Sequence, residues 1–200
     1  MLCGVRGGDK PLLLDFLFSL CYVFLMIEIR NYIPSDRPYL EHICSVTDRY
    51  HLETELLYTL YLHNYTDSDP SHVFVAVSDG KPVGYILCAA DHALWARAMR
   101  ERFLRGKREE IVRTGEESIE GYVPYLADYP AHMHIDIDPE YQRMGIGRSL
   151  MNALVDKLRA EGVKGLMLTV SPENTRAVAF YTKCGFRRIG EDVEALGLIL

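Results

Sequence analysis

Short apolar or alternating runs predict the strands in the first half of the chain. Residues 27–32 form the first run, and residues 72–77 and 83–89 form two more. Asp79-Gly80 stands between the last two runs, and Asp-Gly flanked by apolar residues is a strong hairpin signal. We therefore expect one strand followed later by a β-hairpin.

Helical spacing fills the interval between the first strand and the hairpin. Residues 36–49 and 51–63 repeat their apolar positions every three or four residues, which predicts two amphipathic helices. The polar residues 64–71 predict a loop. The expected order of the first half is strand, two helices, hairpin.

The second half alternates strands and helices. Residues 132–137 alternate between apolar and polar and predict a strand, and residues 145–161 continue as a helix. The apolar run 164–170 predicts a buried strand, and 175–183 a short helix. Residues 193–200 are expected to supply the last strand or to end before it is complete. The whole pattern predicts an α/β (α+β) fold, with a mixed, mostly antiparallel sheet of six or seven strands and helices on both faces.

Residues 91–130 interrupt this order as a long insertion. Its first part, residues 92–113, is helical in pattern and dense in Arg, Lys and Glu, which favours a solvated helix face over a binding surface. Its second part, residues 121–130, holds three tyrosines and two prolines and predicts a stiff aromatic loop that leads into the strand at 132–137.

The first 25 residues form an apolar extension that does not fit the pattern. Leu12 to Ile27 is apolar apart from Asp15, too short and charged for a typical membrane span and without a signal-peptide cleavage site. A misassigned start, with Met26 as the first residue, is the favoured interpretation, and a weak membrane anchor is the second. Residues 26–200 are expected to form a single domain.

Composition supports a compact cytoplasmic protein. The chain has 200 residues, 48% hydrophobic and 25% charged, which suits one domain with a sizeable core. Its formal net charge of −6 argues against a general nucleic-acid binder. The five cysteines are scattered and show neither metal-ligand spacing nor a disulfide framework, so no metal site is predicted.

Residues 142–148 carry the strongest chemical signal of the chain. Gly145 and Gly147 follow a predicted strand and open a predicted helix. Such a turn can point successive backbone N–H groups into one concavity, and the helix start adds the positive end of its dipole. The turn lacks the third glycine of a dinucleotide fingerprint, since Leu150 stands there, and it lacks the Gly-Lys-Ser/Thr of a P-loop. The sequence therefore predicts a phosphate or pyrophosphate site.

Two motifs together resemble the GNAT superfamily of acetyl-CoA-dependent N-acetyltransferases. One is the Gln/Arg-x-x-Gly-x-Gly/Ala turn at 142–147, and the other is Asn174-x6-Tyr181 followed by Gly185-Phe186. The resemblance implies a GNAT fold in which the fourth and fifth strands are parallel and splayed apart. It also implies an enzyme, an acyltransferase that moves the acetyl group of acetyl-CoA to a primary amine by direct transfer in a ternary complex.

The same resemblance implies the cofactor-binding residues. Backbone N–H groups of the turn would hold the pyrophosphate, residues 135–137 would pair with the pantetheine arm, and Asn174 and Tyr181 would meet the cofactor near its sulfur. For Asn174, simple capping of the following helix is an equally complete explanation. For Tyr181, the functional role is general acid for the leaving thiolate, and packing in the core is the alternative. The implied set is Ile135, Asp136, Ile137, Arg143, Met144, Gly145, Ile146, Gly147, Arg148, Asn174 and Tyr181.

The general base is left open between two explanations. Because side chains alternate along a strand, His132, His134 and Asp136 should share one face, and Met133, Ile135 and Ile137 the other. Asp136, together with His134 or a water molecule, could remove the proton of the amine. A purely structural network among these groups and the tyrosines of the preceding loop is the competing interpretation.

A narrower resemblance and two alternatives complete the expectations. The aromatic loop and the strand that follows it look like the acetyltransferase-like domain attached to O-GlcNAcases and like its free-standing microbial relatives. A catalytically inactive binding module stays open, as does a membrane-tethered interaction protein. The expected partners are acetyl-CoA and an unidentified amine acceptor, with no nucleic acid, no membrane and a homodimer compatible with the sequence.

Overall fold

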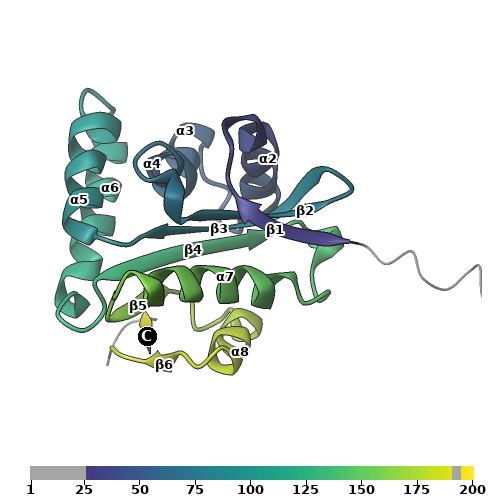
Figure 1. Cartoon of the computed structure of the whole chain (residues 1–200). Helices are drawn as coiled ribbons and strands as arrows, with labels where there is room; N and C mark the ends of the chain where they lie inside the picture. Colours follow the sequence, from purple (N-terminus) through teal and green to yellow (C-terminus); the bar gives the residue numbers. More distant parts are fainter. Residues whose placement is uncertain (1–25, 191–194) are drawn as a thin grey trace, which may run out of the picture.

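In the computed structural model, residues 26–190 and 195–200 are described, and they form one seven-stranded sheet (Figure 1). The predicted membrane anchor or misassigned start lies outside these residues. The strand order is β1-β2-β3-β4-β5-β7-β6. The strands are β1 (Ile27–Asn31), β2 (Val73–Ser78), β3 (Lys81–Ala89), β4 (Ala131–Ile137), β5 (Gly165–Thr169), β6 (Arg187–Arg188) and β7 (Ala195–Ile199).

The sheet is antiparallel except between β4 and β5. These two strands run parallel and share only two register pairs, Ala131 with Leu166 and His132 with Met167. Beyond His132 the strands separate, while β4 remains paired with β3 as far as Ile137. The predicted fold class is confirmed, including the parallel, splayed fourth and fifth strands.

Helices cover both faces of the sheet, as predicted. Figure 1 shows α2, α3 and α4 on one face, α7 and α8 on the other, and α5 and α6 side by side at one end. Their bounds are α2 (Arg37–Thr47), α3 (Thr54–Tyr58), α4 (Asn64–Thr66), α5 (His92–Ala98), α6 (Glu109–Tyr122), α7 (Ile146–Ala160) and α8 (Thr175–Lys183). Short 3-10 turns occupy Pro34–Asp36, Pro70–His72, Val123–Tyr125 and Pro139–Tyr141, and π-helical segments occupy η2 (Thr59–His63) and η4 (Met99–Leu104). In the described part of the chain, no helix is both long and apolar enough to cross a bilayer.

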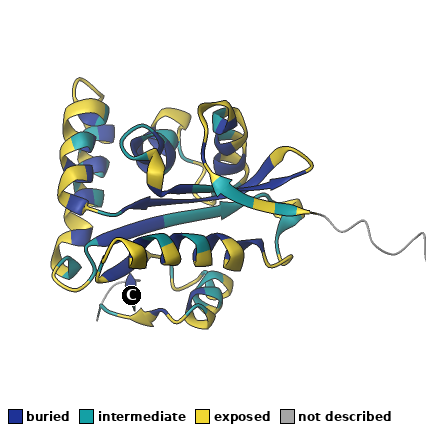
Figure 2. Ribbon diagram, viewed as in Figure 1, coloured by how far each residue is buried: buried dark blue, intermediate teal, exposed yellow. Residues whose placement is uncertain are grey.

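Each face of the sheet has its own hydrophobic core, and alternation along β4 explains the division. Met133 belongs to the core under α7 and α8, and Ile135 and Ile137 pack against it. The other core lies under α2 to α6 and includes Tyr65, Trp95 and Tyr122. Figure 2 shows the resulting pattern, with buried inner helix faces and exposed outer ones.

The predicted helix over 51–63 begins later than expected. The Asp48 carboxylate accepts hydrogen bonds from the backbone N–H groups of Tyr50 (2.8 Å) and Leu52 (2.6 Å). This turn, together with a positive φ of 52° at His51, keeps the chain non-helical until Thr54. The predicted loop over 64–71 is also wrong in part, because the helical path continues through α4.

The insertion is built differently from its predicted layout. Its first helix ends before Gly106, which has a left-handed φ of 76°. Helix α6 then runs to Tyr122, so the first residues of the predicted aromatic loop are helical. A buried stripe at Ile111, Gly115, Ile119 and Tyr122 explains this extension, because these positions recur every three or four residues. The charged side chains of the insertion pair with one another on the solvated face, for example Arg100 with Glu116 at 2.7 Å.

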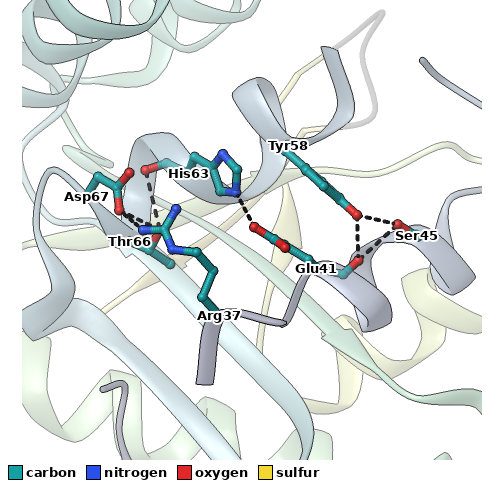
Figure 3. Close-up of polar contacts among 7 residues, drawn as sticks. All are labelled: Arg37, Glu41, Ser45, Tyr58, His63, Thr66 and Asp67. Atoms are coloured by element: carbon teal, nitrogen blue, oxygen red, sulfur yellow. Dashed lines mark hydrogen bonds and ion pairs between the residues drawn. The ribbon is translucent and has the colours of Figure 1, made fainter. Parts of the chain in front are cut away.

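Polar contacts fasten α2 to the segment formed by α3, η2 and α4 (Figure 3). Glu41 meets His63 at 2.9 Å, and the hydroxyl groups of Ser45 and Tyr58 lie 2.8 Å apart. Arg37 forms an ion pair with Asp67 at the far end of the segment. These contacts hold together the helices that form one wall of the cavity described next.

Candidate functional site

A cavity of about 300 Å³ opens where β4 and β5 separate. Its walls are formed by residues of α2, α3, η2, α4, α6, β4, β5 and α8, and by residues of the loops that follow α2 and β5. They include Cys44, Thr47, Asp48, Arg49, Tyr50, Leu57, Leu60, Tyr61, Tyr65, Ser118, Tyr122, Met133, His134, Ile135, Asp136, Thr169, Val170, Ser171, Asn174, Ala177 and Tyr181. Five residues predicted from sequence thus gather in one place: His134, Ile135, Asp136, Asn174 and Tyr181.

The glycine turn presents open backbone donors at the start of α7. Gly145 is left-handed, with φ of 85°, and Arg143 also has a positive φ of 68°. Among the described residues, the N–H groups of residues 143–147 have no hydrogen-bond acceptor. The Gln142 side chain donates to the carbonyl of Ile137 at 3.0 Å and ties the turn to the end of β4. An array of free N–H groups at a helix start suits an anion.

The two glycines of this turn are required for different reasons. A Cβ on Gly145 would meet nothing within 4 Å, so its left-handed backbone is the constraint. A Cβ on Gly147 would lie 3.2 Å from Ile137 Cδ1 and 3.2 Å from Phe180 Cζ. At Gly147 close packing of α7 on β4 and α8 is sufficient reason.

The two arginines of the turn are both exposed, but they differ in their contacts. Arg148 Nη2 donates to the carbonyl of Lys183 at 2.8 Å, at the end of α8. This bond satisfies one of the carbonyl groups that a helix end leaves free. Arg148 therefore holds α8 in place, and Arg143 projects from the turn itself.

Because β4 and β5 separate, one edge of β4 has no neighbouring strand beyond His132. Residues 133–137 pair with β3 on one side, whereas on the other side β5 has already moved away. Main-chain groups on that side can therefore pair with an extended, amide-containing ligand. Ile135, Asp136 and Ile137 lie along this edge, where the sequence placed the pantetheine arm.

Tyr181 and Asn174 come to the cavity from α8. Tyr181 is only 9% exposed, and its ring packs against Phe180 and Phe186 at centroid distances of 5.3 and 5.8 Å. Burial raises the pKa of Tyr181, so its hydroxyl keeps its proton at neutral pH. Asn174 Oδ1 accepts from the N–H of Ala177 at 3.3 Å and caps α8. The capping explanation for Asn174 is thus realised, with the residue still on the cavity wall.

His134 and Asp136 form a pair inside the cavity. Asp136 Oδ2 lies 2.8 Å from His134 Nε2 and accepts a hydrogen bond from the Tyr85 hydroxyl at 2.7 Å. Burial disfavours both charges, but the mutual attraction and hydrogen bond prevail. They raise the pKa of His134 and lower the pKa of Asp136. The Tyr61 ring lies over this histidine, with centroids 5.2 Å apart.

His132 does not belong to that pair, although the sequence grouped the three residues. It is fully buried, stacked on Tyr122 at 4.0 Å, with Nδ1 3.2 Å from the Tyr65 hydroxyl. Burial lowers the pKa of His132 well below its usual value, so the ring is neutral. The structural interpretation fits His132, and the pair of His134 and Asp136 is separate.

Several residues in and behind the cavity were not identified from the sequence. Tyr61, Tyr65 and Ser118 belong to its walls, and the buried Tyr85 of β3 joins His134 and Asp136 from behind as the third member of a polar cluster. The four-residue spacing of Leu57, Tyr61 and Tyr65 was the available signal, since it puts them on one helical face. Among the described residues, no cluster of three or more His, Cys, Asp or Glu could hold a metal ion.

The sequence of the chain is similar to a known protein family and to several characterised proteins. The sequence model described as the acetyltransferase (GNAT) family matches residues 38–186. The [ribosomal protein bS18]-alanine N-acetyltransferase of Escherichia coli K12 is 34% identical over 77 residues, which cover 38% of this chain and 52% of the relative. The match thus spans about half the length of that relative. The N-alpha-acetyltransferase 30 of Schizosaccharomyces pombe is 24% identical over 158 residues, 78% of this chain and 83% of the relative.

Solved structures agree with the family match. A crystal structure named SsHAT has a TM-score of 0.77 and 29% identity, and the alignment covers 86% of this chain and 98% of that one. A putative acetyltransferase from Salmonella typhimurium with its cofactor acetyl-CoA has a TM-score of 0.54 and 14% identity, with 87% and 94% covered. At that identity the second likeness concerns the fold alone.

Proposed function

Because this chain belongs to the GNAT acetyltransferase family, whose members are acyltransferases, we propose that it moves the acetyl group of acetyl-CoA to a primary amine by direct transfer in a ternary complex. One observation carries the proposal. A single cavity lies where β4 and β5 separate, and His134 and Tyr181 reach it from opposite elements, β4 and α8. Donor and acceptor can therefore meet without a covalent enzyme intermediate.

The residues present fit acetyl-CoA. The N–H groups of residues 143–147 offer an anion site for the pyrophosphate. The N–H of Arg148 donates to the Gly145 carbonyl and its guanidinium to Lys183, so its proposed contribution is the positive charge alone. The free edge of residues 135–137 offers main-chain partners for the amides of the pantetheine arm. Asn174 and Tyr181 stand where the arm would end. Acetyl-CoA supplies the acetyl group as a thioester, which is activated toward attack by an amine.

Two side chains of this chain move protons in the proposed reaction. His134 takes a proton from the attacking amine nitrogen as the new carbon–nitrogen bond forms. Tyr181 donates its phenolic proton to the sulfur as the carbon–sulfur bond breaks, which avoids release of a free thiolate. Buried Tyr181 is protonated at neutral pH, as this role requires. The products are an N-acetylated amine and free coenzyme A.

We assign the base to His134 and an orienting role to Asp136. The Asp136 carboxylate already accepts from Tyr85 and His134, and its lowered pKa makes it a weak proton acceptor. His134 uses Nε2 for its hydrogen bond with Asp136, so Nδ1 is the ring nitrogen proposed to take the proton. A carboxylate that holds one imidazole nitrogen makes the other more basic and fixes the ring.

Further expectations from the sequence remain proposals. A closer kinship with the acetyltransferase-like domains of O-GlcNAcases rests on the aromatic segment before β4 and on that strand. A cytoplasmic location and a homodimer are compatible with the fold. The Escherichia coli relative is named for an alanine of a ribosomal protein, so a protein amine belongs among the acceptors to be tested.

A two-part experiment tests the function. First, acetyl-CoA is titrated while the melting temperature is followed, because a ligand that binds only the native state raises it. Second, free thiol release is measured with a panel of small amines, amino sugars and peptides, and the acetylated product is identified by mass. We expect a rise in melting temperature and amine-dependent thiol release. A rise without release from any amine would favour the inactive binding module, and the absence of both would refute the proposal.

A further inference from the structure

One end of the cavity is not used by the donor or by the proton-transfer groups. This inner end is lined by Tyr61, Tyr65, Ser118 and Tyr122. It lies beside the amino-terminal half of β4, since His132, next to the cavity residues Met133 and His134, touches both Tyr65 and Tyr122. The proposed donor edge, residues 135–137, lies at the other half of the same strand. The inner end therefore extends away from the donor, past His134.

A solid aromatic wall closes the inner end. Tyr122 stacks on His132 at 4.0 Å, and Trp95 meets the same imidazole edge-on at 4.4 Å. The Tyr65 hydroxyl lies 3.2 Å from His132 Nδ1, and all four side chains are buried. These buried side chains contact one another and form the wall behind Tyr65 and Tyr122. The inner end is thus a blind pocket.

The insertion builds part of this pocket. Ser118 and Tyr122 lie one turn apart on α6, and both face the cavity. Ser118 is small, so it leaves room where a larger residue would fill the end. Opposite them, the π-helical segment η2 carries Tyr61 over the His134 ring. Residues distant in sequence, from η2, α4 and α6, therefore shape one space.

We propose that this blind pocket is the acceptor subsite and that it takes a small primary amine with a planar, apolar body, an inference that rests on the proposed acetyl transfer. The four lining side chains are three tyrosines and one serine, none of them charged. Tyrosine faces suit a flat apolar group, and their hydroxyl groups can bond one polar substituent. The amine then lies at His134, and the body fills the inner end.

A polypeptide acceptor fits this shape poorly. Its terminal amine can reach His134 from the open side, but the chain must trail outward, because the inner end is closed. The blind pocket would then stay empty and contribute nothing to affinity. A small amine with an aromatic ring uses it fully, and burial of the ring adds binding free energy in proportion to its apolar area.

Binding of 2-phenylethylamine and tyramine tests the inference independently of turnover. Each amine is added to the protein saturated with coenzyme A, which cannot donate an acetyl group, and the melting temperature is followed. We expect a rise of about 5 °C at a hundredfold excess over Kd. Ser118→Trp and the milder Ser118→Leu should abolish this rise, while the shift caused by acetyl-CoA shows that each variant is folded.

Glu117→Trp is the matched control, because Glu117 is exposed on the outer face of the same helix. It should keep the response to both amines. A peptide with a free amino terminus that binds the coenzyme A complex better than tyramine, or a Ser118→Trp variant that still responds to tyramine, would overturn the proposal. If the amines bind as expected but no thiol is released from acetyl-CoA, the acceptor pocket stands and the proposed transfer fails.

Discussion

The proposed donor side and the proposed acceptor side of the cavity are built from different parts of the chain. On the donor side, the site is formed mainly by backbone groups, namely the open N–H groups of residues 143–147 and the free edge of β4. On the acceptor side, the site is formed by side chains from η2, α4, α6 and β4. A backbone site tolerates many side chains but needs particular dihedral angles, whereas a side-chain site is defined by residue identity.

This difference indicates that the acceptor side determines which amine is recognised. A donor shared by a whole family can be held by a backbone site fixed by glycines and strand geometry. The acceptor side depends on an insertion that this chain places between β3 and β4, and its shape can change without disturbing the donor side. Substitutions on the two sides should therefore have different effects on acetyl-CoA affinity and on the reaction rate. The expected effects follow, from the largest to the smallest.

Tyr181→Phe should have the largest effect on rate. The change keeps the packing against Phe180 and Phe186 but removes the proton donor, so kcat should fall by about a hundredfold. Steady-state thiol release measures it, and the acetyl-CoA melting shift should stay unchanged. Tyr32→Phe is the control, because Tyr32 is also buried, its hydroxyl has no hydrogen-bond partner within residues 26–190 and 195–200, and it lies outside the cavity. A loss of only a few-fold at Tyr181 would leave it a packing residue.

Gly145→Val should weaken acetyl-CoA binding by about thirtyfold, because a β-branched residue resists the left-handed backbone and distorts the donor array. Isothermal titration measures the affinity. Gly162→Val provides the matched control, since Gly162 has a similar φ of 73° and equally open surroundings at the end of α7. Equal losses of affinity in both variants would mean that strain alone, and not the anion site, is responsible.

Asp136→Asn should change the pH dependence of kcat/KM as well as lower it by about tenfold. Asp136 raises the pKa of His134 above its usual 6.5, so the wild-type rate should fall as pH drops through that raised value and His134 becomes protonated. Without the carboxylate, burial lowers the pKa of His134, and the fall should move to lower pH.

The ratio of wild-type to variant rate, measured with the same amine from mildly acidic to mildly alkaline pH, cancels the ionisation of the acceptor itself. This ratio should be smallest at acidic pH. A ratio that does not change with pH would contradict the assignment of His134 as the base.

The smallest effect is expected at the ion pairs that join the insertion to the helices near the cavity. Lys107 and Arg108 pair with Glu55 and Glu53 on the surface. The double variant Lys107→Ala, Arg108→Ala should change kcat/KM by less than about twofold and the melting temperature by no more than about 3 °C, because exposed pairs contribute little. A larger loss of activity would show that these pairs, and not the buried aromatic wall, position α6.

The fold, including the turn that opens α7, could be predicted because its signals are local. The alternation at 132–137 and the glycine turn at 142–147 specify a strand, a turn and a helix from adjacent residues alone. The turn after Thr47 was harder, because Asp48 binds backbone groups in place of a helix start. The π-helical segments and the extension of α6 depend on tertiary packing and carry no local signal.

The cluster of His134, Asp136 and Tyr85 was predicted only in part, because it also depends on tertiary packing. Alternation put His132, His134 and Asp136 on one face, but it could not separate the first from the other two. That separation comes from Tyr85 and Tyr122, which reach β4 from β3 and from α6. The acceptor pocket was not predicted at all, since it joins Tyr61 and Tyr65 of the adjacent η2 and α4 to Ser118 and Tyr122 of α6, which is distant in sequence.

Amide resonances in an NMR titration with acetyl-CoA test the central claim most directly. If the backbone of the turn holds the donor, the N–H signals of residues 143–147 should shift strongly and saturably, along with those of residues 135–137 on the free edge of β4. Signals of Ser118 and Tyr122 should hardly move until an aromatic amine is added. Saturable binding that leaves residues 143–147 unperturbed would contradict the account.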